Sequence, residues 1–117
     1  MNKYAKPGVI LYNDARDRCY LILEKFISLP NTWRCIYRGE DGRYRIYYIS
    51  EPELELAADG VWKVLSGISL SDVYLNSIIN GGDVGYETLK KTFDLADNVV
   101  LKMKYSNEKA AQKKENV

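Results

Sequence analysis

The spacing of apolar residues changes once along the chain, close to residue 67. Before this point, short runs of β-branched and aromatic residues alternate with Pro, Gly, Asn and Asp, a pattern typical of antiparallel strands. After it, apolar residues recur at intervals of three and four, as on one face of a helix. The sequence therefore predicts an α+β chain in which the sheet precedes the helices. We expect strands at residues 9–12, 19–27, 32–38, 43–49 and 61–65, a helical turn at 51–54, and helices at 69–80 and 84–105.

The first helix is expected to begin at Ser69, which can cap it together with Asp72. The second carries the most regular stripe in the sequence, with steps of 3, 4, 3, 4 and 3 residues between Tyr86, Leu89, Phe93, Ala96, Val100 and Met103. Such a stripe packs on its own domain or forms a homodimer, here through Tyr86, Leu89, Phe93, Val100 and Met103. Side chains of residues 99–105 also fall into two alternating sets, as in an edge strand. Of the two interpretations, we favour the helix. Residues 106–117 are polar, so we expect a frayed helix end or a disordered tail after one domain at 1–105.

Asp41-Gly42 predicts a tight turn between the strands at 32–38 and 43–49. A loop of two or four residues pairs odd-numbered residues before the turn with even-numbered residues after it. One face then holds an apolar core wall of Trp33, Cys35, Tyr37, Tyr44, Ile46 and Tyr48. The other face holds Ile36 and the five residues of a candidate contact face: Arg34, Arg38, Arg43, Arg45 and Tyr47. A loop of three residues would pair odd with odd and break up this contact face.

The chain contains ten Tyr but no His. Without His, Ser-His-Asp and Cys-His nucleophile activation and His-ligated metal sites are excluded. The acidic cluster Glu51, Glu53, Glu55 and Asp59 offers carboxylates for Mg²⁺ or for acid–base catalysis, but no phosphate-binding glycine loop accompanies it. We therefore expect no catalytic residues, no cofactor and no metal.

The two cysteines, Cys19 and Cys35, lie in apolar runs without the spacing of a zinc site, which predicts buried free thiols. The sequence shows neither a secretion signal nor an apolar run long enough to span a membrane. The expected location is therefore the cytoplasm.

Four arginines beside Tyr47 favour a role in macromolecular contact, because Arg and Tyr dominate binding at many interfaces. Arginine also suits planar, bidentate pairing. The leading hypothesis is a small non-catalytic binding protein that uses this face to contact a host protein or a second copy of itself. The alternative is nucleic-acid binding through the same face and the Lys-rich segment 102–114, although 17 basic residues against 16 acidic ones argue against a globally basic binder. The arginines can instead be solvated and paired with nearby carboxylates of Glu40, Asp41, Glu51, Glu53 and Glu55.

The order of elements over residues 6–66 resembles that of small SH3-like barrels. The resemblance rests on Lys6-Pro7-Gly8 before a first strand, three further antiparallel strands, the helical turn at Glu51-Pro52-Glu53-Leu54 and a short fifth strand. It implies an antiparallel SH3-like barrel or bent meander of four or five strands, followed by two helices. Barrels of this kind with added helices recur in phage and mobile-element proteins that inhibit or retune host machinery, which implies an inhibitor-type function. Ribonuclease toxins with a related barrel open similarly, and RNA cleavage is the third hypothesis.

Overall fold

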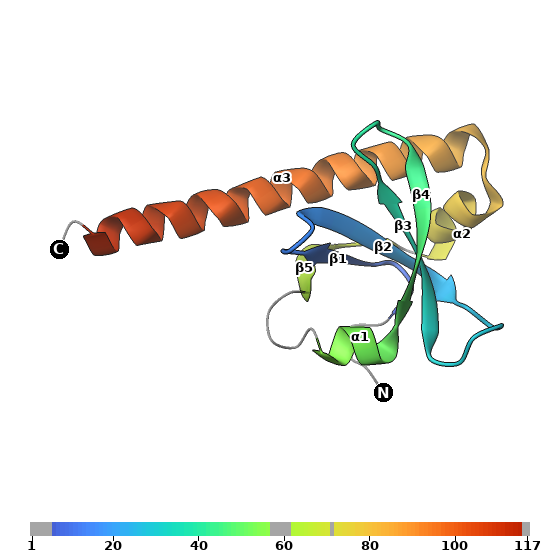
Figure 1. The fold of residues 1–117 in the computed structure, drawn as a ribbon. Helices are drawn as coiled ribbons and strands as arrows, with labels where there is room; N and C mark the ends of the chain where they lie inside the picture. The colour runs from blue at the N-terminus through green and yellow to red at the C-terminus, as the bar shows by residue number, and fades with distance from the viewer. Residues whose placement is uncertain (1–5, 57–61, 71, 116–117) are drawn as a thin grey trace.

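The computed structural model describes residues 6–56, 62–70 and 72–115. Its elements are β1 (Val9–Asn13), β2 (Arg18–Lys25), β3 (Thr32–Arg38), β4 (Tyr44–Ser50), α1 (Glu51–Leu56), β5 (Trp62–Ser69), α2 (Asp72–Asn80) and α3 (Gly82–Glu115) (Figure 1). The strands form one antiparallel sheet in the order β4-β3-β2-β1-β5. The predicted α+β fold is confirmed. Because β4 and β5 remain as the two edges, the sheet is a bent meander and is not closed into a barrel.

The sheet carries an apolar cluster on each face. On the face covered by the helices, residues of β1, β2, β3 and β5 pack against α2 and α3: Ile10, Tyr12, Cys19, Leu21, Leu23, Ile36, Leu65, Leu75, Ile78, Leu89, Phe93, Ala96 and Val100. The opposite face buries a smaller cluster of Leu11, Tyr20, Ile22, Cys35 and Ile49. Strands β1 and β2 are thus buried on both faces, which explains why their sequences are almost continuously apolar.

Helix α3 lies across the sheet with its predicted stripe facing inward. Leu89, Phe93 and Val100 are buried in the core of the chain itself. Of the five residues predicted for a homodimer, Tyr86, Leu89, Phe93, Val100 and Met103, three are therefore covered by the chain itself, and the stripe packs on its own domain, the first of the two alternatives. Residues 99–105 are helical, as favoured, and the strand alternative is wrong.

Helix α3 is longer than its apolar stripe. Its 34 residues correspond to about 51 Å at the α-helical rise, close to the longest dimension of the molecule, 53 Å. Figure 1 shows its C-terminal half projecting beyond the sheet. The helix continues through the polar segment to Glu115, where we expected a frayed end or a disordered tail.

The boundary between β5 and α2 differs from the prediction. Ser69 was expected to cap a helix, but it is the last residue of β5 and pairs with Val9 of β1. The backbone N–H of Leu70 donates to Gly8 O at 3.2 Å, which extends the contact. Strand pairing with β1 therefore takes precedence over the local capping pattern, and α2 begins at Asp72.

The hairpin between β3 and β4 has a three-residue loop. Gly39 N donates to Arg43 O at 2.7 Å, and the strands pair residues of like parity, for example Cys35 with Tyr47. The prediction of a two- or four-residue loop is wrong, and every side chain of β4 therefore lies on the face opposite to the one expected.

Truncation of the buried stripe of α3 should destabilise the fold. We expect Phe93→Ala, at a side chain that is 2% exposed, to lower the free energy of unfolding by about 3–5 kcal/mol. The matched variant Leu101→Ala, at an exposed position of the same helix, should change it by less than about 0.5 kcal/mol. Urea titrations followed by circular dichroism provide the measurement, and equal effects of the two variants would contradict this packing.

Both cysteines are free and buried, as predicted. Burial raises the pKa of each thiol to about 12, and only the thiolate reacts readily with disulfide reagents. An aromatic disulfide reagent at pH 8 should therefore leave the native protein unmodified and titrate both thiols in denaturant. If the native protein rapidly released one equivalent of the reagent's aromatic thiol, this would contradict the burial of Cys19 or Cys35.

Candidate functional site

The five residues of the predicted contact face do not share a face. Arg34 and Arg38 project on the helix-covered side of β3, whereas Arg45 and Tyr47 pair with Tyr37 and Cys35 and project on the other side. Arg43 lies at the end of the loop that precedes β4. The single face expected from sequence is thus not formed, because the three-residue loop inverts β4 relative to β3.

Three of the four arginines form ion pairs. Arg45 meets Asp41 at 2.7 Å within the hairpin, and Arg34 meets Glu24 at 2.5 Å on the neighbouring strand. Of these two carboxylates, only Asp41 was among those expected from sequence. The arginines are therefore committed in large part to contacts within the chain.

Arg38 joins the sheet to α3. Its Nη1 donates to Asp94 and its Nη2 to Asp97, each at 2.7 Å, and its guanidinium lies 5.9 Å from the centre of the Phe93 ring. Burial lowers the pKa of Arg38, but the hydrogen bonds to Asp94 and Asp97 outweigh it and raise the pKa above its usual value. Nothing in the local sequence signals this pairing, since the two carboxylates lie 56 and 59 residues away.

Tyr47 was expected at the surface beside the arginines, but it packs against the smaller cluster. Its ring centre lies 5.3 Å from that of Tyr20, and its hydroxyl donates to Glu53 at 2.9 Å. Arg16, which the sequence did not single out, covers it with its guanidinium 5.0 Å from the ring centre. Arg16 also donates to the Tyr20 hydroxyl at 3.3 Å. Tyr47 is therefore a partly buried residue held by contacts within the chain at this end of the sheet.

The acidic cluster is partly used in structure. Glu51 accepts a hydrogen bond from Trp33 Nε1 at 3.4 Å, and Glu53 accepts the one from Tyr47. Asp59 and the side chain of Glu55 lie outside the described residues. Within the described part of the chain, no group of acidic or cysteine side chains is arranged to hold a metal ion.

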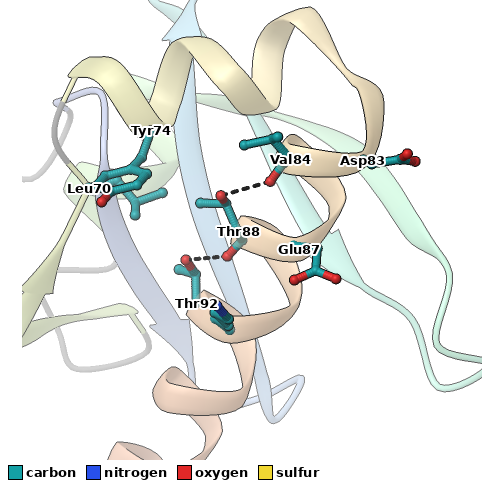
Figure 2. A pocket seen from close by; sticks show the side chains of 8 residues that line it. Leu70, Tyr74, Asp83, Val84, Glu87, Thr88 and Thr92 are labelled. Atoms are coloured by element: carbon teal, nitrogen blue, oxygen red, sulfur yellow. Dashed lines mark hydrogen bonds between the residues drawn. The ribbon is translucent and has the colours of Figure 1, made fainter.

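A hollow lies between α2 and α3, beside the end of β5. It has a volume of about 620 Å³ and is lined by Leu70, Tyr74, Asp83, Val84, Glu87, Thr88, Lys91 and Thr92. We call it the α2–α3 groove. Figure 2 shows Leu70 and Tyr74 on one side of it and Val84, Thr88 and Thr92 in a row along α3 on the other. Its volume falls in the range of small-ligand and side-chain pockets.

Glycines set the width of this groove. Gly81 and Gly82 form the turn between the helices with φ values of +79° and +90°, a conformation that favours glycine. At Gly85, a Cβ atom would lie 2.5 Å from the backbone oxygen of Ser77 in α2. The two helices therefore touch at Gly85, and any larger residue there would push them apart.

The walls of the groove are apolar and its charges lie on the rim. The hydroxyls of Thr88 and Thr92 donate to carbonyls one turn earlier in α3, at 2.8 and 2.7 Å, so their protons are not offered to a ligand. Val84 and Tyr74 are 68% and 55% exposed. Along the rim, the carboxylates of Asp83 and Glu87 come first and the ammonium of Lys91 follows one turn later. The groove thus offers apolar contact flanked by a negative and then a positive charge.

Loss of the link between β3 and α3 should weaken the fold. Arg38→Ala removes two charge-assisted hydrogen bonds from a partly buried guanidinium and should lower the free energy of unfolding by about 1–2 kcal/mol. Arg45→Ala is the matched control, because its ion pair with Asp41 is exposed and local. Its thermal unfolding midpoint should stay close to that of the wild type. If both variants unfold like the wild type, Arg38 does not hold α3 to the sheet.

Among the residues that the structure describes, no helix combines the length and apolar character needed to span a membrane. Comparison with known proteins gives no match: no family model matches this chain, and neither a curated protein nor a solved structure is significantly similar to it.

Proposed function

We propose that this chain is a small non-catalytic protein that binds another protein, and that the α2–α3 groove is its binding site. The observation that carries the proposal is an apolar hollow of about 620 Å³ whose walls include exposed Val84 and Tyr74. Concave, mostly apolar pockets with a few polar groups at their edge are the usual form of a binding site. A function as an inhibitor of a host protein would operate through the same contact.

The groove is held in shape by the core beneath it. Leu89 and Phe93, which come directly after the groove residues Thr88 and Thr92, are buried against the sheet. Gly85 fixes the contact between the helices. A rigid apolar groove loses little conformational entropy when a side chain enters it. This favours an insertion mode in which a large apolar residue of the partner fills the space between Tyr74 and Val84.

The charges on the rim define the partner further. Asp83 and Glu87 complement a basic residue at the α2–α3 turn, and Lys91 complements an acidic residue one turn along α3. The partner is therefore a segment of a protein that presents a large apolar residue between a basic and an acidic one.

The other functions considered have less support. For nucleic-acid binding, the arginines would need to be free, but Arg34, Arg38 and Arg45 pair with carboxylates. Lys104 of the lysine-rich segment likewise meets Asp17 at 2.6 Å. For RNA cleavage, general acid–base groups would need to converge, whereas the charged residues of the groove lie exposed on its rim.

Selection from a random peptide library displayed on phage tests the groove directly. We expect selected peptides to share a large apolar residue between a basic and an acidic one. Val84→Glu places a charge in the groove and should weaken their binding at least tenfold, about 1.4 kcal/mol. Leu101→Glu, at another exposed apolar position of α3, is the matched control and should bind like the wild type. Peptides that bind Val84→Glu as well as the wild type would overturn the proposal.

Exchange of the rim charges tests the orientation of the partner. The double variant Glu87→Lys/Lys91→Glu should bind the selected peptides less well and prefer peptides in which the basic and acidic residues are exchanged. Circular dichroism of each variant shows whether α3 is intact. Equal binding of both peptide sets by both proteins would leave the apolar contact standing but overturn the assigned orientation.

A further inference from the structure

Strand β4 is an edge strand with few of the features that usually protect such edges. Among the strands that the structure describes, it pairs only with β3. The ladder runs without a register shift from Thr32↔Ser50 to Arg38↔Tyr44, and the sequence of β4, YRIYYIS, has no Lys, Pro or Gly. The opposite edge, β5, contains Lys63 and Gly67 and has a register shift against β1. Natural proteins use charges, bulges and prolines to prevent edge pairing, and of these β4 has a single charge, Arg45, and neither a bulge nor a proline.

The backbone of β4 offers a regular set of unpaired groups. At one end of the ladder Gly39 N donates to Arg43 O, and at the other Glu51 N donates to Asn31 O. Since bonded pairs alternate along an antiparallel ladder, the odd-numbered residues of β4 bond to β3. The N–H and C=O groups of the even-numbered residues Tyr44, Ile46 and Tyr48 therefore point away from the sheet.

Exposed apolar side chains accompany these backbone groups. Ile46 and Tyr48 are 44% and 48% exposed on the helix-covered face, beyond the area that the helices reach. The ring of Phe26 lies 4.7 Å from that of Tyr48, and the turn after β2 adds Ile27 and Leu29, both exposed. At the other end of β4, Tyr44 meets the exposed Tyr86 of α3 edge-on, with ring centres 5.9 Å apart. An extended segment that pairs with β4 would cover both sets of aromatic residues.

From this edge we infer that two copies of this chain associate through their β4 strands into one continuous antiparallel sheet, with the two-fold axis at Ile46. In this register Ile46 faces Ile46 of the second copy, and Tyr44 faces Tyr48 of the second copy on both sides of the axis. These are the residues whose backbone groups point outward, so they form the hydrogen-bonded pairs. Each copy brings its Tyr44 and Tyr86 next to Tyr48 and Phe26 of the other, which builds two rows of aromatic rings.

The charge pattern of β4 selects this register and this occupant. Its only charged residue is Arg45, which faces the uncharged Tyr47 of the second copy when the axis lies at Ile46, so no like charges are opposed. An axis at Arg45 would place two guanidiniums opposite each other, which is unfavourable. An axis at Tyr47 would place Arg45 opposite Ile49, a fully buried residue. Of the registers centred on residues 45, 46 and 47, the one centred on Ile46 therefore opposes neither two like charges nor a charge and a buried residue, as a self-complementary two-fold interface requires.

The oligomeric state of the full chain tests this inference, by sedimentation velocity over a range from micromolar to millimolar. We expect a concentration-dependent dimer. Ile46→Lys places two ammonium groups at the axis and should raise the dimer dissociation constant at least tenfold. The matched control is Val64→Lys on β5, which is 40% exposed and should dimerise like the wild type. A wild type that stays monomeric throughout, or a dimer that Ile46→Lys does not weaken, would overturn the inference.

A cysteine at the axis tests the register without a change of charge. Opposed residues of a bonded pair lie about 5.5 Å apart at Cα, within the range of a disulfide, and the native thiols are buried. Mild oxidation of Ile46→Cys should therefore give a covalent dimer on a non-reducing gel, whereas Val64→Cys should stay monomeric. A covalent dimer from Val64→Cys but not from Ile46→Cys would place the interface on the other edge. Val84→Glu should leave the dimer intact, so this test and that of the groove can fail separately.

Discussion

The packing of α3 on the sheet is the contact on which the rest of the structure depends. Leu89, Phe93 and Val100 bury one face of the sheet, and the hydrogen bonds from Arg38 to Asp94 and Asp97 fix the helix across the hairpin. Without this helix the sheet would expose most of the larger apolar cluster to water, at a cost of about 25 cal/mol for each Å². The position of α3 also decides which surfaces remain open, because it forms one wall of the α2–α3 groove and leaves Ile46 and Tyr48 uncovered.

The three-residue loop between β3 and β4 is the second constraint. It turns Tyr47 and Ile49 of β4 to the smaller cluster, beside Cys35 of β3, and turns Tyr44 and Ile46 to the side of the helices. The same turn separates Arg45 from Arg38, so the arginines serve different parts of the fold instead of one binding face. The loop also determines which backbone groups of β4 point outward. One additional or missing residue in it would invert the strand and remove the self-complementary edge.

The two proposed surfaces differ in the kind of partner they suit. The groove is concave, apolar and bordered by charges of both signs, which fits a short segment of another protein. The β4 edge is extended and self-complementary, which fits a second copy of the same chain. Both use α3, which contributes Val84 to the groove and Tyr86 to the β4 surface, but the two surfaces share no residue. A dimer would then present two grooves, and a partner with two matching segments would bind with an effective concentration set by their separation.

The sequence alone determined the class of the fold, because hydrophobic periodicity reports local geometry: period two before residue 67 and a 3–4 spacing after it. It also determined that Phe93 and its neighbours face a core and that the cysteines are buried. The faces of the hairpin could not be determined in this way, because a change of one residue in loop length inverts them and Asp-Gly occurs in loops of several lengths. The partners of Arg38 and the walls of the groove could not be determined from the sequence either, since both bring together residues that are separated along the chain. Only the tertiary structure decides which side chains meet across such distances, and with them where the surfaces for other molecules lie.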